Sequence, residues 1–277
     1  DLPARCHQIC DPSRPVTFVP MLGDRRRWEY MLIPGETAAD LEDPVAMWHL
    51  LAPWVGPEDF EVIRAIVYSF HALVATRWRS GRILLAGDAA HQMPPFLGQG
   101  LCAGLRDVAN LTWKLQAVAD GRAGDGLLDT YDLERRPHAA AVVAHAVEAG
   151  RLIDQLAGRI DAQADPSAGY GGDRPFPHLV DGVCWGDDPM VGRQLPQPWP
   201  GADEALGDGW AVLTRSGSAV GGLGARAVAS GLAGPAGGIV VRPDRYVAAV
   251  AETDEELERA LADLGRWFEA SEQAVGA

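Results

Sequence analysis

The feature that most constrains the fold is a strand, a loop and a helix that follow one another in the first half of the chain. Residues 82–86 form a short apolar run that ends in Gly87-Asp88, a pattern typical of a buried strand that opens into a functional loop. After a loop rich in proline and glycine, we expect a helix over residues 101–119, with Gly121 as its C-cap. Its apolar residues recur at helical spacing, and they are Leu101, Leu105, Val108, Leu111, Leu115 and Val118.

The first 160 residues divide into two regions. Residues 1–67 carry short apolar stretches with aromatic residues, and they are expected to form strands at 16–20 and 28–33 and helices at 43–51 and 57–66. Residues 68–160 contain the motif and a second long helix, which begins near Leu127 and is interrupted or restarted at Pro137.

A third region, residues 161–277, combines a linker with a small α/β domain. The linker is rich in proline, glycine and aspartate. The expected elements after it are strands at 210–214, 238–241 and 246–251 and an amphipathic helix at 254–268. We expect the Gly/Ala/Ser stretch at 216–238 to be poorly ordered. The whole chain is therefore predicted to be an α/β protein of mixed α+β character.

Composition and charge argue against several classes of partner. The formal net charge is −14 and no basic stripe offsets it, which argues against nucleic acid and an anionic membrane surface. No apolar run approaches the roughly 18 residues of a membrane helix. Cys6 and Cys10 flank His7 without a second pair at zinc-like spacing, so we expect no metal site. The cysteines fit no disulfide framework and indicate a reducing, cytoplasmic setting; they are Cys6, Cys10, Cys102 and Cys184.

Two short patterns in the motif are suited to binding a ligand. Asp88 follows the predicted strand, where open α/β sheets bind ligands, although an aspartate there can equally cap a turn or the next helix. Gly98 and Gly100 would let the backbone approach a flat ligand, and the helix start that follows favours an anion. A glycine-containing loop that merely enters a helix is the alternative.

The combined run resembles one known family. Residues 82–115 read RILLAGDAAHQMPPFLGQGLCAGLRDVANLTWKL. This run is similar to the second FAD fingerprint of the flavoprotein aromatic hydroxylases, the class A FAD-dependent monooxygenases. The flanking runs RRWEYMLIPGE at 26–36, YDLERRPH at 131–138 and VRPDRYV at 241–247 resemble the phenolic-acid and polyketide branch, which includes the 3-(3-hydroxyphenyl)propionate hydroxylases. The last of these runs resembles part of that branch's C-terminal thioredoxin-like domain.

The resemblance implies roles for individual residues. Asp88, after Gly87, would hydrogen-bond the flavin ribityl chain, and Pro94 and Pro95 would lie beside the isoalloxazine ring. The turn at Gly98, Gln99, Gly100, Leu101 and Cys102 would present its amides to the flavin's pyrimidine side; many relatives carry Asn where Cys102 stands. Arg106 and Asp107 are interpreted as a charge pair on the helix surface. Catalytic residues are not assigned, and the expected substrate-lining residues are Trp28, Tyr30, Tyr68 and His71.

The resemblance also implies an activity and the cofactors that it needs. NADH or NADPH would reduce FAD, O2 would add to give a flavin C4a-hydroperoxide, and a small phenolic substrate would be hydroxylated; a homodimer is compatible with this.

The chain also departs from the family. The strand, G-x-G-x-x-G turn and helix that hold the ADP half of FAD do not occur in a matching context, and the tail lacks C-x-x-C. The chain opens with Asp1 rather than Met, so we expect that Asp1 is not the natural start of translation; processing, a chosen boundary of the chain or missing upstream residues would each explain this. A non-catalytic remnant, a flavin-binding module lacking the ADP-binding half, and a polyketide-type hydroxylase are the alternatives. By this resemblance the fold would be the C-terminal part of a doubly wound FAD/NAD(P)-binding fold, with a substrate-binding sheet at 1–67, an FAD-binding region at 68–160 and a thioredoxin-like tail at 161–277.

Overall fold

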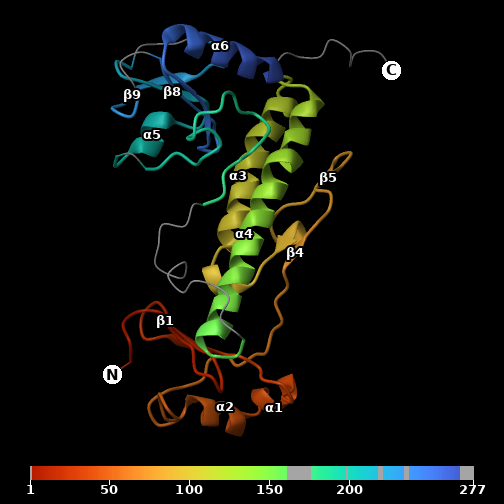
Figure 1. Cartoon of the computed structure of the whole chain (residues 1–277), viewed down its shortest axis with the longest axis vertical. Helices are drawn as coiled ribbons and strands as arrows, with labels where there is room; N and C mark the ends of the chain where they lie inside the picture. Colours follow the sequence, from red (N-terminus) through yellow and green to blue (C-terminus); the bar gives the residue numbers. More distant parts are fainter. Residues whose placement is uncertain (1, 161–175, 198, 218–220, 234–236, 269–277) are drawn as a thin grey trace. The chain divides into compact units, whose positions relative to one another are not determined.

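The computed structural model describes residues 2–160, 176–197, 199–217, 221–233 and 237–268 (Figure 1). The chain divides into two compact units. The first contains Asp1–His71 and Ala146–Asp173, and the second contains Ala72–His145 and Arg174–Ala277. Within the described residues, no helix is long and apolar enough to cross a membrane, and no group of His, Cys, Asp and Glu side chains is arranged to hold a metal ion.

The first unit is built on a three-stranded antiparallel sheet. Its strands are β1 (His7–Ile9), β2 (Val16–Pro20) and β3 (Arg26–Tyr30), with β2 in the middle. A turn at Gly23, whose φ is +66°, joins β2 to β3. The side chains of Phe18, Trp28, Trp54 and Phe60 pack together beside this sheet.

Two short helices follow the sheet. Helix α1 (Ala38–Glu42) begins with a capping box between Thr37 and Asp40. Helix α2 (Pro44–Leu51) has Asp43 as its N-cap and proline at its first position, which matches the helix predicted at 43–51. The helix predicted at 57–66 is wrong, because the chain there is irregular beyond a turn. Ile63 and Ile66 remain exposed, so a helix would have buried no apolar face to stabilise it.

The second unit contains one long helix and most of another, which continues beyond His145 into the first unit, with short strands beside them. Strand β4 (Leu73–Val74) pairs with β7 (His91–Gln92), and β5 (Arg79–Ser80) pairs with β6 (Ile83–Leu84). Helix α3 (Gly100–Ala119) and helix α4 (Asp129–Leu156) follow, with the short 3-10 helix η3 (Asp125–Leu128) between them. Pro137 lies inside α4 without ending it.

Two predictions for this region need correction. The strand expected at 82–86 is reduced to the two residues of β6, and Ile83 is 68% exposed because no described element covers it. The leucines expected to form the buried stripe of α3 are mostly exposed, with Leu101 at 77% and Leu105 at 60%. The buried face of α3 is largely polar instead and consists of Ala103, Asp107, Asn110, Lys114 and Ala117.

The second unit also contains the C-terminal four-stranded sheet, in the order β11-β10-β8-β9. Its strands are β8 (Ala211–Thr214), β9 (Arg226–Ala229), β10 (Gly238–Val241) and β11 (Val247–Ala251), with β8 and β9 parallel and the other pairs antiparallel. Alternate residues enter separate cores, so Val212 and Val240 belong to one cluster and Leu213 and Ile239 to the other.

Helices flank this sheet. Helix α5 (Ala202–Leu206) precedes β8, and helix α6 (Asp254–Gly265), capped by Thr253, runs into the 3-10 turn η5 (Arg266–Phe268). We expected residues 216–238 to be poorly ordered. This is wrong for residues 226–229, because they form strand β9 and pair with β8. Residues 218–220 and 234–236 of that stretch lie outside the described residues.

Candidate functional site

The turn at Gly87-Asp88 lies directly against the start of α3. Gly87 has φ +57° and opens the 3-10 turn η1 (Gly87–Ala89), which is closed by the Ala90 N–H donating to the Gly87 carbonyl at 2.8 Å. A Cβ atom on Gly104 of α3 would lie 3.3 Å from the Gly87 Cα. The helix backbone therefore approaches the turn closely because both positions are glycine. Asp88 is exposed and can reach a ligand.

The loop between β7 and α3 exposes its backbone at two glycines. The buried Pro94 leads into the 3-10 turn η2 (Pro95–Leu97). Gly98 ends this turn in the left-handed region at φ +61°, and its N–H donates to the Pro95 carbonyl at 2.9 Å. A Cβ atom added at Gly98 or Gly100 would meet nothing within 4 Å. A flat ligand could therefore lie against the backbone there without competing side chains.

The start of α3 is suited to an anionic or hydrogen-bond-accepting group. The first helical bond runs from the Ala103 N–H to the Gln99 carbonyl at 2.8 Å, so the amides of Gly100, Leu101 and Cys102 precede it. The first turn contains no acidic residue, and the Gln99 side chain makes no capping bond. The helix dipole thus adds a partial positive charge at an end whose first turn carries no acidic side chain.

A buried carboxylate, Asp107, fixes this arrangement from behind. Its Oδ2 accepts from the Gly87 N–H at 3.0 Å and lies 2.7 Å from His91 Nε2, and its Oδ1 accepts from Arg135 Nε at 3.0 Å. His91 in turn stacks on Trp78, with ring centroids 5.5 Å apart. Asp107 therefore ties α3 to the turn that presents Asp88, to β7 and to α4.

The interpretation of Arg106 and Asp107 as a surface charge pair is wrong. Asp107 is fully buried and pairs with Arg135, whereas the Arg106 guanidinium lies 4.4 Å from the ring centre of Phe176. The sequence did contain a signal for this. Polar residues at 107, 110 and 114 are spaced three and four apart and therefore share one helix face.

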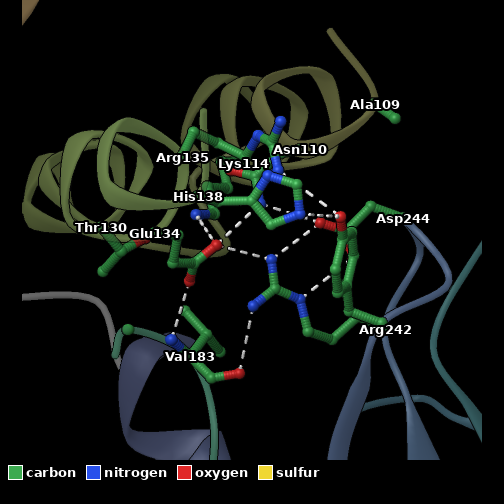
Figure 2. Close-up of polar contacts among 12 residues, drawn as sticks. Ala109, Asn110, Lys114, Thr130, Glu134, Arg135, His138, Val183, Arg242 and Asp244 are labelled. Carbon is green, nitrogen blue, oxygen red and sulfur yellow. Dashed lines mark hydrogen bonds and ion pairs between the residues drawn. The ribbon is translucent and has the colours of Figure 1, made fainter. Parts of the chain in front are cut away.

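A second buried cluster continues along the same face of α3 (Figure 2). Lys114 Nζ and Arg242 Nη2 both donate to Glu134 Oε2 at 2.7 Å. Asn110 Nδ2 donates to the same Glu134 oxygen at 2.7 Å and to Asp244 Oδ2 at 2.9 Å. The four charged side chains sum to zero formal charge, which is how a closed protein interior accommodates ions.

The charges in this cluster set its ionisation. Burial by itself would raise the pKa of Glu134, but the neighbouring Arg242 and Lys114 outweigh it and lower that pKa to about 2. Burial lowers the pKa of Lys114 to about 8, with Glu134 opposing the shift. Both groups are therefore ionised at neutral pH.

The four candidate substrate-lining residues all lie in the first unit and have different surroundings. Trp28 packs edge-on against Phe18, and the Tyr30 hydroxyl donates to the Leu50 carbonyl at 2.6 Å. Burial raises the pKa of Tyr30 to about 12. Tyr68 and His71 are exposed. These contacts give Trp28 and Tyr30 packing roles in this structure and leave Tyr68 and His71 accessible.

Comparison with known proteins identifies the family. Residues 5–146 match the family described as FAD binding domain. The chain is 48% identical over 156 residues to a 3-(3-hydroxy-phenyl)propionate/3-hydroxycinnamic acid hydroxylase of Mycobacterium sp. (strain KMS), an alignment that covers 56% of this chain and 27% of the relative. It is 37% identical over 223 residues to a probable NADH-specific resorcinol 4-hydroxylase of Rhodococcus jostii (strain RHA1), covering 77% of this chain and 42% of the relative.

Solved structures share the fold. A ternary complex of aklavinone-11 hydroxylase with FAD and aklavinone superposes with a TM-score of 0.68 at 26% identity, covering 95% of this chain and 58% of that one. The flavin-dependent monooxygenase PieE, in complex with FAD and substrate, gives a TM-score of 0.69 at 20% identity, covering 93% and 60%.

The chain belongs to the FAD-binding domain family, and its α/β fold is that of the FAD-binding aromatic hydroxylases. It spans less than half the length of the two curated relatives.

Proposed function

We propose that this chain forms part of an FAD-dependent monooxygenase that hydroxylates a phenolic ring with NADH or NADPH and O2. The observation that carries the proposal is the start of α3 at Gly100, which has no side-chain cap, follows the open backbone at Gly98 and lies close to the turn that carries the exposed Asp88. These residues fit the flavin end of FAD, which combines a flat ring, hydrogen-bond acceptors and a polyhydroxy chain. Two curated relatives that are named as hydroxylases of phenolic compounds support the substrate class.

Each part of the site would have a separate task. Asp88 would accept hydrogen bonds from the ribityl hydroxyls, and Pro94 and Pro95 would border the ring. The Gly98 to Cys102 backbone would donate hydrogen bonds to the pyrimidine oxygens and favour negative charge on the ring. Bound FAD would supply the redox chemistry, taking electrons from the nicotinamide and activating O2. Trp28, Tyr30, Tyr68 and His71 remain our proposed substrate-lining residues.

The remaining assignments are also proposals. We retain a sheet region at 1–67 for the substrate, an FAD-binding region at 68–160 and a thioredoxin-like tail at 161–277. The four cysteines are free, which supports a reducing, cytoplasmic setting. A homodimer is compatible with the family. The structural likeness to aklavinone-11 hydroxylase favours one second candidate, hydroxylation of a polyketide-type aromatic ring.

The test is to purify the protein at its natural length and record its visible spectrum. NADH and NADPH oxidation would then be measured with and without meta-substituted phenols and a polycyclic phenol. The proposal predicts bound flavin and oxidation that rises severalfold with a phenol that is itself hydroxylated. A protein without flavin, or one whose oxidation rate ignores every phenol, would refute it.

A further inference from the structure

The turn that joins β10 to β11, residues 242–246, is buried, whereas hairpin turns usually lie at the surface. Arg242 is fully buried, Tyr246 is 2% exposed and Asp244 is 7% exposed. Arg245 within it has φ +67°, which is uncommon for a residue other than glycine. Figure 2 shows Arg242 and Asp244 reaching from the strands toward side chains of α3 and α4. This segment, called here the 242–246 turn, therefore does more than connect two strands.

The 242–246 turn holds both long helices through ionised groups. Arg242 donates to Glu134 of α4 at 2.7 Å and to both oxygens of Asp244, at 3.0 and 2.7 Å. Asp244 in turn accepts from Asn110 of α3 at 2.9 Å. Arg242 also donates to the Val183 carbonyl at 3.3 Å. Because these groups are buried, the loss of one partner would leave an uncompensated charge.

The same turn reaches the flavin-facing end of α3 through one side chain. Arg135 Nη1 donates to the Tyr246 hydroxyl at 3.4 Å, and Arg135 Nε donates to Asp107 at 3.0 Å. Asp107 then accepts the N–H of Gly87 at 3.0 Å. An unbroken series of contacts thus runs from the C-terminal sheet to the turn that presents Asp88. All of its members lie within one compact unit.

We propose that the 242–246 turn positions the flavin-binding turn at Gly87-Asp88, acting through Arg135 and Asp107. The inference rests on the proposed function and assigns to the C-terminal domain a positioning role, consistent with a sequence that lacks C-x-x-C. The competing view is that the buried charges only attach the C-terminal sheet to α3 and α4. In that case, changes in the turn would lower stability without affecting Gly87 or flavin affinity.

The experiment uses the natural-length holoenzyme with two variants of the turn. Arg242→Met removes the guanidinium and keeps an unbranched apolar stem, and Tyr246→Phe removes only the hydroxyl that meets Arg135. Leu206→Ala is the control, since Leu206 is 2% exposed in the opposite core of the C-terminal sheet. FAD dissociation constants and hydrogen exchange at the amides of residues 87–90 would be measured for each.

We expect Arg242→Met to raise the FAD dissociation constant about tenfold and Tyr246→Phe about threefold, the size of coupling carried by packed networks. Exchange at residue 87 should accelerate in both. Leu206→Ala should lower the melting temperature and leave both readouts at parental values. If Arg242→Met fails to fold, Tyr246→Phe decides the question alone.

Parental flavin affinity and exchange in Tyr246→Phe would overturn the positioning role while leaving the proposed function intact. The same follows if Leu206→Ala weakens FAD as much as the turn variants do. A parent protein without flavin would refute the proposed function and this inference with it.

Discussion

Asp88 is an exposed carboxylate on a turn whose preceding amide is held by Asp107. We predict that Asp88→Ala in the natural-length protein weakens FAD binding by about 1.5–3 kcal/mol, the contribution of a hydrogen bond to a charged group. Fluorescence titration of the apoprotein would measure it. Because the side chain is exposed, the melting temperature without flavin should not change. Equal FAD dissociation constants for the variant and the parent would show that Asp88 does not contact the flavin.

Substitutions at two glycines of α3, Gly100 and Gly104, should distinguish an effect on FAD binding from an effect on folding. A Cβ atom added at Gly100 would meet nothing within 4 Å, whereas one added at Gly104 would lie 3.3 Å from the Gly87 Cα. We therefore predict that Gly100→Val folds normally but binds FAD about five- to thirtyfold more weakly, the effect of a steric clash of about one or two kcal/mol with the ligand. Gly104→Val should instead lower the melting temperature of the flavin-free protein. Full flavin occupancy and an unchanged reduction potential in Gly100→Val would contradict this placement of the ring.

At the scale of elements, α3 and α4 are joined by ion pairs, so their packing depends on pH. The pKa of Glu134 is lowered to about 2 in the folded protein from an ordinary 4.5. The stabilisation from its ionised form is therefore complete above pH 4.5 and is lost as the pH falls toward 2. We predict that Glu134→Gln costs about 3–5 kcal/mol at pH 7 because Arg242 and Lys114 lose their counter-ion.

Urea unfolding at several pH values would measure this. The variant should lose less stability than the parent between pH 4.5 and pH 2. Parallel stability curves over that window would show that Glu134 does not hold the two helices together.

Some helices and strands could be predicted from the sequence and others could not. The loop, the length of α3, the capped α2 and α6, and the C-terminal strands follow from local signals such as glycine, proline and periodicity. The burial of the polar face of α3 does not. The spacing places Asp107 and Lys114 on one face, but it is their partners far along the chain that bury them, while Leu101 and Leu105 satisfy a helical pattern yet lie exposed. Ion pairs between residues far apart in the chain leave no local pattern in the sequence. The sequence alone therefore does not identify Arg242 and Glu134 as buried partners.

At the scale of the whole molecule, the chain carries the residues that we propose to face the flavin, and its sequence has no turn that matches the dinucleotide-binding pattern. Gly221-Gly222-Leu-Gly224 does not lead from a strand into a periodic helix. We predict that residues 1–277 expressed alone retain little FAD, since nothing in their sequence matches the turn that receives the pyrophosphate. Flavin absorbance at known protein concentration would test this, with the natural-length protein as the control. Stoichiometric FAD bound to residues 1–277 would show that the ADP half of FAD binds to a part of this chain that does not match the dinucleotide-binding turn.

We propose hydroxylation of a phenol as the activity of the proposed flavin site. Its most direct test is mass spectrometry of the product formed by the natural-length protein from NADH, a meta-substituted phenol and isotopically labelled O2. We expect a ring-hydroxylated product that carries one labelled oxygen atom. Consumption of NADH with an unlabelled product, or with none, would contradict it.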